Sequence, residues 1–147
     1  MKIENIELHY LSMPEILDEA DGSQDALIVK VEAGGYIGWG ECEASPLTSI
    51  ANFICPKSHS AAQPIKDTIL GSDLNNINDV KKIIHNVKQN SLMIAQTPHT
   101  FSGIEVAILD LLGKKNQTSI YDMIDTKNQI LKLPMLQYYL EIVQMKH

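Results

Sequence analysis

The segment at residues 99–112 restricts the possible folds of this chain more than any other part of the sequence. Apolar side chains lie on nearly every side of the helix that it would form, and its charged members are Glu105 and Asp110. A helix that is apolar all round must be covered on most of its sides. Gly113 follows at a position where helices often end, and two lysines come after it. The sequence therefore predicts a central helix enclosed by other elements.

Alternation and turn residues predict a three-stranded antiparallel meander in the first third of the chain. Residues 3–10 alternate between apolar and polar side chains, and residues 26–33 are rich in apolar and β-branched ones. The glycine pair at 34–35 is a hairpin signal because both residues can adopt a positive φ. Residues 36–43 would then return as the third strand. An acidic, turn-prone loop at 11–23 separates the first two strands.

Three further helices are expected between this meander and the central helix. Pro46 suits the first helical position of a segment that runs through residue 54. A second helix would span residues 58–70, with Pro64 in its first turns and Gly71 closing it. A third would run from about residue 76 to residue 94, where apolar residues recur at helical spacing. The fold class that we predict is α+β, an N-terminal three-stranded antiparallel meander followed by a three- or four-helix bundle.

Charge and composition exclude several classes of partner. The chain has 147 residues and a formal net charge of −6, with no basic cluster larger than a lysine pair, so nucleic acid and anionic membranes are poor partners. No stretch approaches the roughly 20 apolar residues of a membrane span, and the first residues lack a signal-peptide pattern. Cys42 and Cys55 are expected to be reduced thiols. We therefore expect a cytoplasmic protein that binds neither nucleic acid nor membrane.

Two motifs, in this order, resemble a known family. The expected third strand carries GWGE at residues 38–41, and the central helix carries IEVAILDLLGK at residues 104–114. They are similar to the GxGE strand end and the AIExALWDLxGK helix of the mandelate racemase/muconate lactonizing group of the enolase superfamily. Residues 133–135, LPM, resemble the entry into the first strand of that family's catalytic barrel.

The resemblance implies a division of the chain. Residues 1–130 would be the N-terminal capping domain, with an enolase N-terminal domain-like fold, and residues 131–147 would be a remnant of the linker and first barrel strand. The departures from the family pattern fall where this domain meets the barrel: Gln117 and Ser119 stand where the family has Gly and Pro, and residues 125–126 stand where it has a glycine pair.

Two loops of the family's capping domain close over the barrel mouth and contact the substrate. By position they correspond to residues 11–23 and 43–59 of this chain. A carboxylate or sugar acid would be the substrate, once the domain is joined to a barrel. Our candidates for substrate contact in these loops are Ser12, Met13, Pro46, Lys57 and His59.

The residues that would carry the chemistry are missing. The resemblance implies a lyase or isomerase, such as a dehydratase or racemase, with Mg²⁺ held by three carboxylates and a Lys or His base, all on the barrel. A (β/α)₈ barrel needs at least about 200 residues, whereas 147 − 133 = 14 residues follow Leu133. We therefore expect a chain truncated before its catalytic barrel, with no catalytic residue, no metal of its own and no activity alone. The alternative is a stand-alone, non-catalytic binding or oligomerisation module.

Other notable side chains have ordinary structural interpretations. Glu41 and Glu43 share one strand face, where such a pair is usually solvated. Glu105 and Asp110 are expected to be half-buried and to accept hydrogen bonds from backbone or from a lysine. Trp39 is expected to pack between the sheet and the helices. The histidines show no zinc-site spacing.

The last part of the chain suggests self-association. Residues 131–145 are apolar and begin like a strand, but the barrel strands that they would pair with are missing. An unpaired strand edge tends to pair with another chain. We therefore expect a homo-oligomer.

Overall fold

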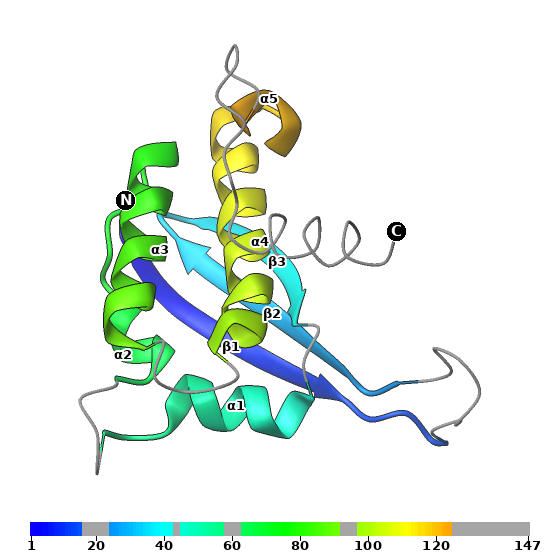
Figure 1. Cartoon of the computed structure of the whole chain (residues 1–147). Coiled ribbons are helices and arrows are strands. Elements are labelled where there is room, and N and C mark those ends of the chain that lie inside the picture. The colour runs from blue at the N-terminus through cyan, green and yellow to red at the C-terminus, as the bar shows by residue number, and fades with distance from the viewer. Residues whose placement is uncertain (16–23, 43–44, 58–62, 92–96, 125–147) are drawn as a thin grey trace, which may run out of the picture.

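A three-stranded antiparallel sheet packed against helices forms the described part of the chain (Figure 1). In this computed structural model the described residues are 1–15, 24–42, 45–57, 63–91 and 97–124. The strands are β1 (Ile3–Leu11), β2 (Ala26–Ala33) and β3 (Tyr36–Cys42), and the helices are α1 (Pro46–Ile54), α2 (Ile65–Ile69), α3 (Ile77–Asn90), α4 (Thr97–Asn116) and α5 (Ile120–Ile124). The predicted α+β fold is confirmed.

The sheet has the order β1-β2-β3, with each strand antiparallel to its neighbour. Along β2 the apolar residues of one face are fully buried: Leu27, Val29, Val31 and Ala33. The two glycines that join β2 to β3 have φ values of 56° and 80°, as the predicted two-residue hairpin requires. The period-two burial of β2 therefore fixes which face of the sheet meets the helices.

Helix α4 is the centre of the core and packs on both β2 and β3. Most of its apolar residues are buried, as predicted, whereas Val106 is 48% exposed; the buried ones are Phe101, Ile104, Ala107, Ile108, Leu109, Leu111 and Leu112. The helix is longer than expected, and the prediction that Gly113 lies just past its end is wrong. The chain turns at Gln117, which has a φ of 53°, and folds back over the helix. A Cβ at Gly113 would lie 2.9 Å from the carbonyl oxygen of Thr118. The absence of a side chain at Gly113 therefore allows the chain at Thr118 to pass close to the helix.

Three glycines allow α4 to lie directly on β3. A Cβ added at Gly38 would lie 1.9 Å from the carbonyl oxygen of Ala107, and one added at Gly40 would lie 2.0 Å from that of Gly103. A Cβ at Gly103 would in turn meet the backbone of Cys42 at 2.7 Å. The glycines of the GWGE segment thus bring two backbones together, a role that differs from the phosphate-binding role of glycine-rich loops.

Trp39 lies on the other face of the sheet, and the prediction that it packs between sheet and helices is wrong. Because side chains alternate along a strand, Gly38 and Gly40 face α4 and Trp39 must point away from it. Its side chain is 45% exposed. Its ring centroid lies 6.0 Å from that of His9 on β1. The tryptophan therefore belongs to an exposed sheet surface.

The two intermediate helices are shorter than the sequence predicts. Pro64 does not lie inside a helix; it has an extended ψ of 150°, and α2 begins directly after it. A proline also disfavours helical geometry in the residue before it. Gly71 closes this segment with the expected positive φ. Helix α3 begins after Asn76, whose side chain accepts hydrogen bonds from two backbone amides of the first turn, and it ends at Asn90.

Several predictions concern residues outside the described ranges. These are the proposed linker and barrel remnant at 131–147 and the apolar tail within it. Among the described residues, no helix combines the length and the apolar character needed to cross a membrane.

Candidate functional site

Both candidate substrate loops leave the same end of the sheet. Leu11 at the end of β1 pairs with Ala26 at the start of β2, and Leu27 pairs with Cys42 at the end of β3. The stem of the first loop and the segment that leads into α1 therefore start side by side (Figure 1). Antiparallel pairing alone brings together two segments that are about 30 residues apart in the chain.

Asp25 fixes the stem of the first loop. One carboxylate oxygen accepts a hydrogen bond from the Tyr10 hydroxyl, and the other accepts one from the backbone N–H of Met13 at 2.8 Å. These bonds favour the charged carboxylate, so they hold the pKa of Asp25 below its ordinary value, with the Tyr10 bond as the largest cause. The same bond raises the pKa of Tyr10. Asp25 thus sets the backbone position at which the first loop begins.

A cluster of buried polar side chains fixes the position of α1, the helix within the second candidate segment at residues 43–59. The side-chain amide of Asn52 donates hydrogen bonds to the hydroxyl of Thr97 at 3.2 Å and to that of Thr100 at 3.4 Å. Thr97 donates in turn to the carbonyl oxygen of Ser91 at 2.7 Å. All four side chains are buried. Because these polar atoms satisfy one another, α1 is anchored to the start of α4 with a defined geometry.

Cys42 joins the sheet to this cluster. Its thiol donates to the carbonyl oxygen of Thr100 at 3.2 Å, and burial raises the pKa of the thiol to about 12. Both cysteines are free, with Cys42 buried and Cys55 exposed. A thiol that stays protonated and buried is a packing group, not a nucleophile.

The structure brings three of the five candidate residues to one end of the sheet. Ser12 and Met13 are exposed directly after β1, and Pro46 is half-buried at the first position of α1. Lys57 is exposed beyond the opposite end of α1, and nine helical residues span about 13 Å. His59 lies outside the described residues. Among the candidates in the described part of the chain, Ser12, Met13 and Pro46 therefore lie at the same end of the sheet, and Lys57 does not.

The acidic residues Glu41 and Asp110 differ in their exposure and in their hydrogen bonds. Glu41 is exposed on β3, and its proposed companion Glu43 lies outside the described residues. Asp110 has the predicted structural role, because it accepts hydrogen bonds from the Trp39 backbone and from Lys114. These contacts make Asp110 a link between α4 and β3.

One carboxylate oxygen of Glu105 lacks, among the described residues, the hydrogen-bond partner that the sequence suggested. It is 5% exposed, and its Oε1 atom has no hydrogen-bond partner in the described part of the chain. Burial raises its pKa to about 7, and the charge of Lys88 offsets this effect in part. Of the residues one turn away on α4, Phe101, Ile108 and Leu109 have no donor, and the hydroxyl of Ser102 donates to the carbonyl oxygen of His99 at 2.6 Å. Glu105 is thus a buried acid in apolar surroundings.

The described residues contain no group of three or more histidine, cysteine, aspartate or glutamate side chains that could hold a metal ion. The side chains of Ser12, Met13 and Pro46 are not metal ligands of the usual kinds. These three candidates would therefore contribute contact with a substrate and exclusion of water.

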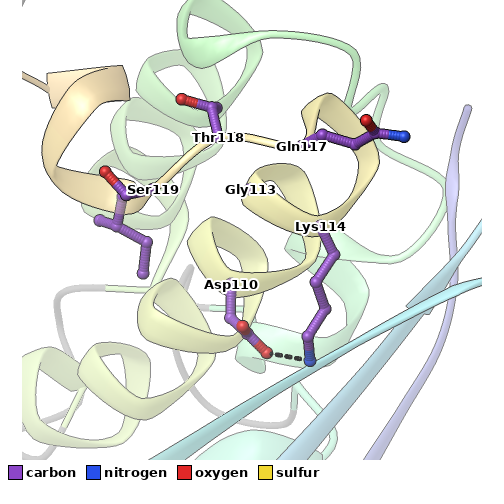
Figure 2. Close-up of a pocket in the computed structure, with 7 residues that line it drawn as sticks. Asp110, Gly113, Lys114, Gln117, Thr118 and Ser119 are labelled. Atoms are coloured by element: carbon purple, nitrogen blue, oxygen red, sulfur yellow. Dashed lines mark hydrogen bonds and ion pairs between the residues drawn. The ribbon is translucent and has the colours of Figure 1, made fainter.

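A pocket of about 330 Å³ lies at the other end of α4, next to α5. Figure 2 shows the residues that line it, Asp110, Gly113, Lys114, Gln117, Thr118, Ser119 and Ile120. Asp110 and Lys114 pair with each other at 2.6 Å, and the Ser119 hydroxyl donates to Asp122 at 2.6 Å. The pocket is separated from α1 by the length of α4 (Figure 1), so it is not part of the candidate loop site.

Comparisons with known proteins agree with this architecture. The family model described as the N-terminal domain of mandelate racemase / muconate lactonizing enzyme matches residues 16–125. The crystal structure of a predicted mandelate racemase from Rhodobacter sphaeroides has 52% sequence identity and a TM-score of 0.80, and the match covers 84% of this chain and 32% of that one. A second solved structure, of a protein provisionally named a racemase, has 25% identity and a TM-score of 0.68, with 86% and 32% covered. No curated protein matches.

Proposed function

The chain belongs to the mandelate racemase/muconate lactonizing enzyme family, in which it is an N-terminal domain, and from this we propose that it is the capping portion of a magnesium-dependent lyase or isomerase. The reaction would be that of a dehydratase or racemase acting on a carboxylate such as a sugar acid. The chain spans 32% of the length of each solved relative. We propose that the catalytic barrel is the part beyond this chain, so that the chain alone is inactive.

The main structural support for this proposal is that the two loop stems start at the same end of the sheet. Asp25 fixes the backbone at Met13, and Asn52 anchors α1, so both stems start from a rigid support. Loops held in this way can exclude water and select a substrate while the reacting groups lie on another domain. Ser12, Met13 and Pro46 are the side chains that we assign to substrate contact, because they lie at this end of the sheet.

The residues that bind magnesium would lie on the barrel. The described part of this chain holds no three-ligand group, so we assign it no step that involves the metal. We also propose a cytoplasmic location, which the free state of Cys42 and Cys55 supports.

A solvent-exchange experiment tests the division of labour. With Mg²⁺ in deuterated buffer, the 147-residue chain is expected to exchange no α-proton of a panel of carboxylates and sugar acids, as followed by proton NMR. A chimera that carries residues 1–124 in place of the matching segment of the Rhodobacter protein is expected to catalyse exchange. Exchange by the chain alone, or a folded chimera that is inactive while the parent protein is active, would contradict the proposal.

The same chimera tests the loop assignment. Truncating Met13 to alanine is expected to raise KM by several-fold, because a contact with the bound substrate is lost. Asn116→Ala is the matched control, since this exposed residue lies at the far end of α4. Equal KM values for the two variants would remove Met13 from the substrate site.

We propose that the chain forms homo-oligomers through the apolar tail at residues 131–145. Support comes from the apolar sequence of this segment. Sedimentation velocity is expected to show a dimer or larger species for the whole chain and a smaller one for residues 1–124. A monomer at micromolar concentration for the whole chain would contradict this prediction.

A further inference from the structure

Strand β3 lies at an edge of the described sheet and, among the described residues, pairs with a strand on one side only. An edge strand presents backbone N–H and C=O groups that can pair with a strand from another chain. In β3, Ile37 and Trp39 stand opposite Glu32 and Lys30 of β2. The side of β3 that faces away from β2 is therefore a potential pairing site.

Two side chains of α4 already occupy this edge. The backbone N–H of Trp39 donates to Asp110 Oδ2 at 2.9 Å, and the backbone C=O of Ile37 accepts from Lys114 Nζ at 3.1 Å. The two side chains are joined by an ion pair of 2.6 Å, which Figure 2 shows beside the strands. A donor and an acceptor from one helix thus satisfy two edge groups that flank Gly38.

The arrangement reproduces what an added strand would supply. A strand pairing at this edge would place a carbonyl oxygen on the Trp39 N–H and an N–H on the Ile37 C=O. Asp110 provides the acceptor and Lys114 provides the donor, one helical turn apart. Gly38 makes this possible, because its missing Cβ lets α4 approach β3 closely enough for both side chains to reach the edge.

We propose that the Asp110–Lys114 pair mimics a strand and closes the β3 edge against pairing with the β3 edge of a second copy of this chain. Two β3 edges can pair about a twofold axis, because such an interface uses the same surface of both copies. The exposed side chains of Ile37 and Trp39, at 40% and 45%, would become cross-strand neighbours in that dimer. The pair therefore prevents an association that the rest of the edge favours.

Amide exchange of the whole 147-residue chain tests the closure directly. The Trp39 amide is expected to be protected in the wild type although it lies on an edge strand, and Asp110→Ala is expected to speed its exchange at least about tenfold, since a hydrogen bond to a charged group is lost. Asp110→Asn keeps an acceptor oxygen and is expected to retain most of the protection. A wild-type Trp39 amide that exchanges as fast as an unprotected one would overturn the proposal.

The assembly state tests the consequence. The double variant Asp110→Ala/Lys114→Ala is expected to gain a species of twice the wild-type mass in sedimentation velocity, whatever the wild-type state is. Lys115→Ala is the matched control, because this lysine contacts the carbonyl oxygen of Asn75 and not β3. Adding Ile37→Pro, which removes an edge donor, is expected to abolish the new species.

Two results would overturn this part of the proposal. One is a folded double variant with the wild-type mass. The other is a new species that persists when Ile37→Pro is present, since it would then form through another surface. Where the double variant loses its far-ultraviolet circular dichroism signal, Lys114→Met alone provides the test. It leaves the Asp110 bond in place and frees only the Ile37 carbonyl oxygen, so a smaller gain of the same species is expected.

Discussion

Replacing Gly40 with alanine is expected to lower the free energy of unfolding by more than about 3 kcal/mol, a large fraction of the stability of a typical domain. The new Cβ would lie 2.0 Å from the carbonyl oxygen of Gly103 and 2.9 Å from the backbone nitrogen of Ala107. These atoms are helix backbone, so they cannot rotate away as a flexible side chain could. Relief would require α4 to move off the sheet. Urea unfolding, followed by circular dichroism and by the fluorescence of Trp39, measures the change.

Gly71→Ala is the matched control for this prediction. Gly71 has a φ of +78°, but nothing lies within 4 Å of the added Cβ. Its substitution is expected to cost about 1 kcal/mol through backbone strain alone. A Gly40→Ala protein as stable as Gly71→Ala would mean that α4 does not lie as close to β3 as the structure places it.

The sheet could be predicted from the sequence because its signals are local. Alternation and the glycine pair at 34–35 act between neighbouring residues, and both predictions are confirmed. The position of Trp39 could also have been derived. Gly38 and Gly40 are two residues apart and must share a face, so the residue between them belongs to the other face. The size of the tryptophan led to the wrong expectation.

The helix ends were harder to predict because tertiary contacts decide them. Gly113 looked like a helix end, but α4 continues to Asn116, and Gln117 is the residue with the positive φ that turns the chain. Pro64 was compatible with a first helical turn, yet it precedes its helix with an extended ψ. In both cases the residue type is compatible with a place inside or outside the helix. The sequence pattern does not show which of the two the folded chain adopts.

The candidate site was predictable in outline only. The shared end of the two loop stems follows from antiparallel pairing, whereas the separation of Lys57 from Pro46 follows from the length of α1. The role of Asp25 was not foreseen. It depends on bonds to Tyr10 and Met13 across the loop, and no spacing rule relates these residues.

The free energy of unfolding is expected to depend on pH because the pKa of Glu105 is raised in the folded chain. Its pKa is about 7 in the folded chain, against an ordinary value of 4.5. Because the folded state binds the proton more tightly, the contribution of Glu105 to the free energy of unfolding is greatest below about pH 4.5. This contribution falls as the pH rises from 4.5 to 7, where the unfolded chain releases the proton first, and it is constant above that range. For a group that is 5% exposed, this interval corresponds to about 3 kcal/mol.

Glu105→Gln isolates this effect, because the amide keeps the shape of the side chain and does not titrate. The difference in unfolding free energy between the variant and the wild type is expected to shift by about 3 kcal/mol in favour of the variant between pH 4 and pH 8. Urea unfolding at a series of pH values measures it. Glu41→Gln is the control, since it removes an exposed carboxyl instead of a buried one. Parallel pH profiles for the wild type and Glu105→Gln would show that water or a donor reaches Oε1, and that Glu105 is not the apolar-enclosed acid found on α4.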